Sequence, residues 1–247
     1  MPAQHVLVIN PNTSDCVTQR LVLQLGEHWP GVQVHGVTAD FGAPYIADEY
    51  SYCVAGHAVL DAWERAQSTA PKGGYACVLI GCFGDPGLDA LREVAPIPVW
   101  GLAQASMLGL AAQGLHRIAI VTGGSKWKPM LERWSAMQGY GQAVAPTVTT
   151  AIAPRSQVVH IAVLPATRME MLQSPERAAN ALAHASVQAL QAHGAQAVLL
   201  GGAGLAGMGA KVRSQTGLEV WDCVEAAKHW LSCSLQRPLA AASAVTA

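Results

Sequence analysis

The sequence of 247 residues has almost no excess charge and no run of basic residues. Only 13% of its residues are charged, and the formal net charge is -1. Neither a nucleic acid nor an anionic membrane surface is therefore an expected partner, because both select strongly basic patches. A hydrophobic share of 51% also excludes an intrinsically disordered chain. The composition is typical of a compact α/β protein with a large core.

Motifs that would indicate a cofactor or a metal are also missing. No GxGxxG follows an expected strand, and residues 123–126 (GGSK) lack the spacing of a phosphate-binding GxxxxGK[ST] loop. The six cysteines have no CxxC spacing, and the nine histidines form no HExxH motif. We therefore expect reduced thiols, no metal, and neither ATP nor a dinucleotide cofactor.

Long apolar segments are missing too. The longest, residues 99–115, contains Gln104, Ser106 and Gln113, and it is too short and too polar to span a membrane. No basic segment followed by an apolar h-region precedes the expected first strand, so no secretory signal is expected. These features predict a cytoplasmic protein without a membrane partner.

The most informative stretch of the chain runs from Ala76 to Asp89. Residues 77–80 form a continuous apolar run, typical of a strand buried on both faces of a parallel sheet, and three glycines and a proline then break it. Cys82 is thus expected just beyond a strand end, where open α/β sheets bind their ligands. The alternative is that Cys82 is a small buried hydrophobic residue, as most free cysteines are.

A second copy of this pattern favours the functional interpretation. Residues 197–204 (AVLLGGAG) align without a gap with residues 77–84 (CVLIGCFG), so that Gly202 stands where Cys82 stands. Two further pairs of segments match in the same way: 98–105 with 219–226, and 5–14 with 117–126. A chain of two similar halves predicts a pseudo-twofold molecule whose strand ends face one shared cleft.

The expected fold class is therefore α/β, with two Rossmann-like, parallel-sheet halves and the active site in the cleft between them. The first half comprises residues 1–102 and 216–247, and the second comprises residues 103–215. Strands are expected at 6–9, 32–37, 77–80, 99–100, 118–121, 147–152, 158–163, 197 onward and 218–221. Helices are expected from about 15, at 53–67, 89–95, from 104, and at 126–137, 176–193, 208–216 and 223–234. Residues 237–247 are expected to be a frayed tail.

Two loops contain further candidates for ligand binding. The turn at 10–14 contains Asn12 and Thr13, which either cap the following helix or point donors into the cleft. The loop at 40–52 is rich in Gly, Pro and Tyr. A loop of this length in a compact protein often serves as a lid.

Three strings resemble the hydantoin racemase branch of the aspartate/glutamate racemase superfamily: VINPNTS (8–14), CFGDPGLD (82–89) and VEAA (224–227). The resemblance covers nearly the whole chain, and the string CFGDPG is quite specific. It implies two α/β halves with a cysteine from each facing the substrate carbon, and no metal, pyridoxal phosphate or nucleotide. In such a site one thiolate removes the α-proton, and the other thiol returns a proton to the opposite face.

Carried over residue by residue, the resemblance makes Cys82 the first catalytic cysteine. It makes the turn at 12–13 a binding loop, residues 83–84 the positions beside the thiol, and residues 122–124 the equivalent turn of the second half. The second catalytic cysteine falls at Gly202, whose turn can still supply backbone donors. The candidate binding residues are Asn12, Thr13, Phe83, Gly84, Thr122, Gly123, Gly124, Gly202, Ala203 and Gly204.

The expected function is that of a cofactor-independent racemase or epimerase. It would move a proton at an acidic carbon next to a carbonyl, in a hydantoin or an amino-acid derivative, through the Cys82 thiol. The expected partner is a small-molecule substrate. A homo-oligomer is compatible with the sequence, which does not define the oligomeric state.

The glycine at position 202 leaves two alternatives open. The chain is also similar to maleate isomerase and to arylmalonate decarboxylases, which use one cysteine to protonate an enediolate on a single face. Those decarboxylases keep the cysteine of the second half, whereas this chain keeps that of the first, and their surrounding motifs differ from CFGDPG. The other alternative is a degenerate racemase that only binds a small cyclic amide or carboxylate.

Overall fold

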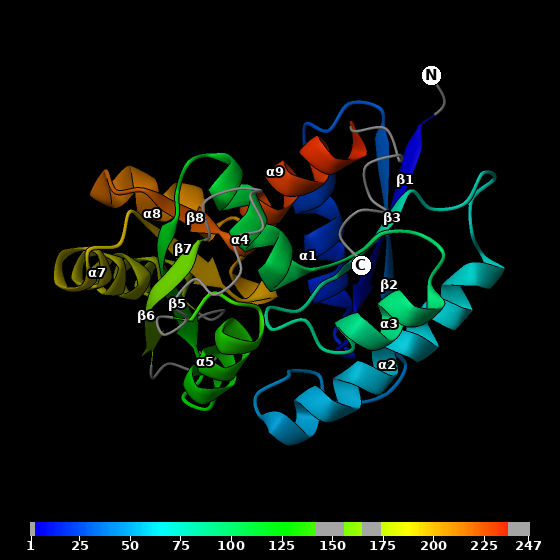
Figure 1. The fold of residues 1–247 in the computed structure, drawn as a ribbon, viewed down its shortest axis with the longest axis horizontal. Coiled ribbons are helices and arrows are strands. Elements are labelled where there is room, and N and C mark those ends of the chain that lie inside the picture. The colour runs from blue at the N-terminus through cyan, green and yellow to red at the C-terminus, as the bar shows by residue number, and fades with distance from the viewer. Residues whose placement is uncertain (1–2, 142–155, 165–173, 237–247) are drawn as a thin grey trace.

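The computed structural model describes residues 3–141, 156–164 and 174–236. The described chain forms two four-stranded parallel sheets, with the orders β2-β1-β3-β4 and β6-β5-β7-β8 (Figure 1). The strands of the first sheet are β1 (Gln4–Asn10), β2 (Val32–Thr38), β3 (Cys77–Ile80) and β4 (Val99–Gly101). Those of the second are β5 (Arg117–Gly123), β6 (Gln157–Leu164), β7 (Ala197–Gly201) and β8 (Val220–Asp222). The identical strand orders confirm the expected architecture of two similar α/β halves.

Helices alternate with the strands, as parallel pairing requires. They are α1 (Asp15–Gly26), α2 (Glu49–Ser68), α3 (Leu88–Val94), α4 (Leu102–Ala112), α5 (Trp127–Met137), α7 (Pro175–His193), α8 (Met208–Thr216) and α9 (Cys223–Leu235). A single turn of 3₁₀ helix, η1 (Ala203–Leu205), follows β7. The expected helices at 176–193, 208–216 and 223–234 are confirmed to within a residue at each end.

Alternating side chains of the strands divide the core into three clusters. In β1, Leu7 and Ile9 pack under α2 and α3, whereas Val6 and Val8 face the opposite side of the sheet together with α1. In the second sheet, α7 and α8 cover one face. The remaining faces of both sheets belong to one central cluster that also includes α4 and α9. This alternation is the period of two that a strand covered on both faces requires.

Helices α4 and α9 join the two halves at the centre of the molecule (Figure 1). They approach so closely that a Cβ added to Gly109 would lie 1.9 Å from the carbonyl oxygen of Ala226. Ser106 Oγ also donates to the carbonyl oxygen of Cys223, at 2.7 Å. Because these helices are the matching segments of the sequence repeat, their contact lies on the axis that relates the halves.

One element departs from the expected division into residues 1–102 plus 216–247 and residues 103–215. Strand β8 pairs in parallel with β7, so it completes the second sheet rather than belonging to the first half. Helix α9 then crosses back to pack against α4 and α1. The placement of this strand in the first half was therefore wrong, and the rest of the division stays a prediction.

Two expectations fall outside the described residues: the strand at 147–152 and the tail at 237–247. Within the described part of the chain, no helix is both long and apolar enough to cross a membrane.

Candidate active site

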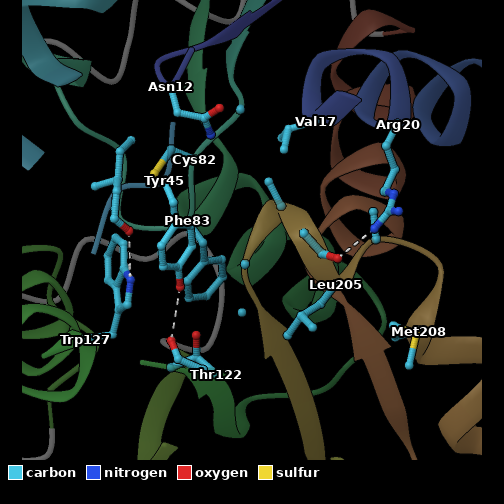
Figure 2. Close-up of a pocket in the computed structure, with 18 of the residues that line it drawn as sticks. Asn12, Val17, Arg20, Tyr45, Cys82, Phe83, Thr122, Trp127, Leu205 and Met208 are labelled. Carbon is cyan, nitrogen blue, oxygen red and sulfur yellow. Dashed lines mark hydrogen bonds between the residues drawn. The ribbon is translucent and has the colours of Figure 1, made fainter. Parts of the chain in front are cut away.

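A cavity of about 390 Å³ lies where the carboxyl ends of strands from both sheets meet (Figure 2). Its volume falls in the range that small-molecule sites usually have. From the first sheet and its helices come Asn12, Val17, Arg20, Tyr45, Ile46, Gly81, Cys82 and Phe83. From the second come Thr122, Gly123, Trp127, Ala178 and residues 201–208. The two halves therefore share one cleft, as the repeat predicted.

Most of the residues singled out in the sequence line this cavity: Asn12, Cys82, Phe83, Thr122, Gly123, Gly202, Ala203 and Gly204. Thr13, Gly84 and Gly124 lie beside it and are not among the lining residues. Each of these three instead holds a neighbouring segment in place. Thr13 N donates to Ala43 O at 3.2 Å, Gly84 O accepts from the Tyr52 hydroxyl at 2.5 Å, and Gly124 O accepts from Trp127 N at 3.0 Å.

Cys82 sits in a tight turn directly after β3. Its backbone N–H donates to Ile80 O at 2.9 Å, and its carbonyl oxygen accepts from Asp85 N at 3.1 Å. Two residues further along the turn, Gly84 has a φ of +126°, and a Cβ there would lie 2.9 Å from the Trp127 ring. Glycine is required at that position for both reasons. The chain beyond the strand thus holds Cys82 at the cavity wall.

The thiol is nearly enclosed, with only 7% of Cys82 exposed. Burial, and then the nearby Asp85 carboxylate, raise the pKa of Cys82 above its usual range. Cys82 is therefore a protonated thiol at neutral pH. A thiolate needs donors that stabilise it, or a substrate that takes up its negative charge.

Backbone N–H groups at both walls are candidates for these donors. Within the described residues, no hydrogen bond uses the N–H groups of Phe83 and Gly84, which follow Cys82. Across the cavity, the N–H groups of Ala203 and Gly204 are likewise unused. Such preorganised donors stabilise a negative charge that develops on a carbonyl oxygen.

Asn12 both braces its turn and faces the cavity. Its Oδ1 accepts from Ser14 N at 2.9 Å and from Asn10 Nδ2 at 3.1 Å, while Ser14 holds the N-cap position of α1. No hydrogen bond within the described chain uses Asn12 Nδ2, which can therefore donate to a ligand. Helix α1 has no side-chain cap, so Asn12 braces the turn before the helix rather than capping it, and its Nδ2 remains for a ligand.

The segment that was expected to act as a lid forms one wall of the cavity and contacts the second half. Tyr45 Oη donates to Gly123 O at 3.5 Å, and Trp127 Nε1 donates to Ile46 O at 3.2 Å (Figure 2). Beyond the wall, Lys126 and Asp48 form an ion pair at 3.0 Å. These contacts hold the segment over the cavity.

The opposite wall has a glycine where the resemblance places a second thiol. Gly202 has a φ of +137°, and a Cβ added there would meet nothing nearer than Leu205, at 3.9 Å. The space for a side chain is thus open, but the backbone conformation favours glycine. Cys82 is the one cysteine among the cavity's described lining residues, since Cys223, at the start of α9, is fully buried.

Sequence patterns did not single out several lining residues, among them Val17, Arg20, Trp127 and Met208. Arg20 is the one charged side chain among the described lining residues, and its Nη1 donates to Gly204 O at 2.9 Å. A charged residue on an exposed helix face carries no local signal of this contact across the two halves. No three His, Cys, Asp or Glu side chains gather into a potential metal site in the described ranges.

Comparisons with known proteins agree with the fold. The family model for Asp/Glu/hydantoin racemases matches residues 6–229. A hydantoin racemase from Paenarthrobacter aurescens is 29% identical over 227 residues, which cover 90% of this chain and 87% of that protein.

Two solved structures have similar folds. An allantoin racemase from Klebsiella pneumoniae superposes with a TM-score of 0.79 at 24% identity, covering 94% of this chain and 87% of its own. An arylmalonate decarboxylase gives a TM-score of 0.61 at 19% identity, with 94% and 92% covered. At these identities, the structural likeness is evidence for the fold alone.

Proposed function

Because the chain belongs to the Asp/Glu/hydantoin racemase family, we propose that it is a cofactor-independent racemase or epimerase whose acid-base group is Cys82. The observation that carries this proposal is the position of the thiol. Cys82 follows a buried strand, lines the cavity shared by the two halves, and is followed by backbone N–H groups that no described residue occupies.

The proposed reaction begins with proton transfer to sulfur. The Cys82 thiolate takes the proton from a carbon next to a carbonyl, and the electron pair of the C–H bond moves into an enolate. The enolate oxygen accepts hydrogen bonds from backbone N–H groups at the cavity wall, and Ala203 and Gly204 are suitably placed donors. A proton that returns to the opposite face of the carbon inverts its configuration.

The returning proton needs a carrier other than a second thiol. Thr122 has a hydroxyl group, is buried, and lines the cavity from the end of β5. A hydroxyl or a water molecule is a weaker acid than a thiol at neutral pH, so we propose that this half of the reaction is the slow one. Proton exchange on the Cys82 face would then outpace net inversion.

The substrate we propose is a 5-substituted hydantoin or a related cyclic amide. The cavity is large enough for such a ring with a side chain, and aromatic and aliphatic groups form most of its walls. The named relatives act on substrates of this kind, since one is called a hydantoin racemase and one an allantoin racemase.

The second candidate is decarboxylation of a malonate-type substrate. It is favoured by the absence of a second thiol among the described lining residues, since protonating an enediolate on one face requires only one. Loss of carbon dioxide would leave the enediolate, and the Cys82 thiol would protonate it.

One experiment separates the candidates. The protein is incubated in deuterated water with 5-substituted hydantoins, allantoin, amino acids and arylmalonates, and deuterium incorporation, optical rotation and carbon dioxide release are followed. Incorporation at the α-carbon with slow loss of rotation supports the racemase. Carbon dioxide release from an arylmalonate without exchange on hydantoins supports the decarboxylase, whereas thermal stabilisation by a ligand without any turnover indicates a binding protein.

A further inference from the structure

Asp85 is a buried residue in the turn at residues 81–87 that contains Cys82, called the thiol turn below. The proposed reaction does not use its carboxylate. Asp85 lies three residues beyond Cys82, is 5% exposed, and adopts a left-handed conformation with a φ of +60°. A carboxylate in such a position is costly unless hydrogen bonds compensate for lost hydration. The hydrogen bonds that Asp85 accepts must therefore offset the cost of burying its carboxylate.

Three N–H groups surround the Asp85 carboxylate. Ala103 N donates to Oδ1 at 2.8 Å, and Gln104 N donates to Oδ2 at 3.0 Å, so that the carboxylate caps the N-terminus of α4. Trp134 Nε1, from α5 of the second half, donates to Oδ2 at 3.1 Å. Asp85 thus joins the thiol turn to α4 and to α5.

The matching helix of the sequence repeat, α9, is capped by a residue at its own N-terminus. There Asp222 is itself the N-cap of α9, and its Oδ1 accepts from Val224 N at 3.1 Å and from Glu225 N at 3.0 Å. In the sequence repeat, Gly101 stands where Asp222 stands, and Leu205 stands where Asp85 stands. The capping carboxylate of α4 therefore comes from the thiol turn, whereas that of α9 comes from the N-cap residue of the helix.

The space around Gly101 supports this exchange. A Cβ built on Gly101 would lie 2.1 Å from Cγ of Asp85 and 2.5 Å from each carboxylate oxygen. The Asp85 carboxylate therefore occupies the volume that an aspartate side chain at position 101 would fill. The Asp85 carboxylate can occupy this position only because residue 101 is a glycine.

The backbone of Asp85 connects this cap to the thiol. Asp85 N donates to Cys82 O at 3.1 Å, and the ring of Phe83, next to the thiol, packs against Trp134 with a centroid separation of 6.2 Å. A shift of Asp85 would therefore displace Cys82 relative to the cavity. In the second half, Asp222 Oδ2 accepts from Gly207 N at 3.1 Å and from Gly209 N at 3.4 Å, so the helix cap holds the segment after Gly202 through hydrogen bonds alone.

We propose that Asp85 is a positioning residue, which anchors the Cys82 turn to the N-terminus of α4 and to Trp134 and so fixes the thiol against the substrate carbon. This role rests on the proposed function of Cys82. In the first half, which has the thiol, the capping carboxylate belongs to the chain segment that contains Cys82, whereas in the second half it belongs to the helix.

The test exchanges the two residues. The single variant Asp85→Gly removes both cap and anchor, and glycine accepts the positive φ. The double variant Asp85→Gly/Gly101→Asp restores the cap and a carboxylate in nearly the same volume, but removes the link between the cap and Cys82 through the chain at position 85. The readouts are the urea midpoint of unfolding, kcat and KM for α-proton exchange, and the rate of Cys82 alkylation by iodoacetamide.

We expect the single variant to lose both stability and exchange, and the double variant to regain the wild-type midpoint while kcat stays about 10²-fold low with little change in KM. Recovery of both midpoint and kcat in the double variant would reduce Asp85 to a helix cap and overturn the proposal. So would a single variant that keeps full kcat.

The rate of Cys82 alkylation tests the positioning role even if the protein has no racemase activity. Should the wild type show no exchange with any substrate, an altered Cys82 alkylation rate in the folded double variant still supports positioning, and a wild-type rate contradicts it. Should the double variant not fold, Trp134→Phe takes its place, because it removes only the anchor to α5. A lowered kcat, or an altered alkylation rate, is then expected, and unchanged values would contradict the anchor.

Discussion

Replacing Gly202 by cysteine tests whether the second wall lacks only a thiol. A Cβ at this position meets no atom nearer than 3.9 Å, so steric overlap contributes nothing to the cost. The φ of +137° does contribute, because side chains rarely adopt this conformation. Strain of this kind costs about 1–3 kcal/mol. We therefore expect Gly202→Cys to fold with a lowered unfolding midpoint.

Gly202→Ala is the matched control, since it has the same backbone strain and no sulfur. A positioned acid or base contributes about 10²- to 10⁴-fold to a rate. Net racemisation of a 5-substituted hydantoin, followed by optical rotation, should therefore be faster in Gly202→Cys than in Gly202→Ala by a factor towards the lower end of that range. Deuterium exchange through Cys82 should be similar in both variants.

A specific pair of results would refute this reasoning. If folded Gly202→Cys racemises no faster than Gly202→Ala, and the wild type releases carbon dioxide from an arylmalonate through Cys82, the racemase proposal is wrong and the decarboxylase proposal stands. The strain alone cannot produce that pair of results, because the alanine control shares it.

Three further predictions concern charge. Burial raises the pKa of Cys82, so the thiolate fraction and the exchange rate should rise with pH through the alkaline range, and a rate independent of pH from 7 to 9.5 would contradict a thiolate base. Burial also raises the pKa of Asp85 from 3.8 to about 7, so the folded state holds a proton that the unfolded state has released. The stabilisation from this bound proton is complete below about pH 4 and is lost as pH rises to about 7. The free energy of unfolding of the wild type in urea should therefore fall relative to that of Asp85→Asn by up to about 4 kcal/mol between pH 4 and pH 8. A difference between the two proteins that does not change with pH would contradict the shift. Arg20 is the one cation among the described lining residues. Arg20→Gln should therefore lower kcat/KM for hydantoins with a carboxylate substituent about tenfold or less, and leave kcat/KM for neutral hydantoins unchanged. Equal losses on both kinds of substrate would contradict a role in charge recognition.

The sequence predicted the fold well where a local pattern determined it. The apolar run at 77–80 and the glycines after it define a buried strand and a turn without any tertiary information, so Cys82 lies at a strand end as expected. The gapless match of residues 197–204 with this run predicted a cavity shared by the two halves. Both inferences depend on periodicity and turn chemistry, which are local properties.

The sequence did not predict features that depend on contacts between distant segments. Strand β8 has only three residues, and nothing within it tells which sheet it completes; its pairing with β7 follows from the way α9 crosses back to α4. Arg20 reaches Gly204, 184 positions away, from an exposed helix face. The partners of Asp85 lie 18, 19 and 49 positions away, so its string CFGDPG indicated a family and did not indicate a helix cap.

The central claim is that Cys82 transfers the proton, and α-proton exchange in deuterated water tests it most directly. Wild type, Cys82→Ala and Cys53→Ala are compared on a 5-substituted hydantoin, where Cys53 is an exposed cysteine outside the cavity lining. We predict exchange at the wild-type rate in Cys53→Ala and a loss of about 10²- to 10⁴-fold in folded Cys82→Ala. Exchange that persists at the wild-type rate in Cys82→Ala would contradict the account.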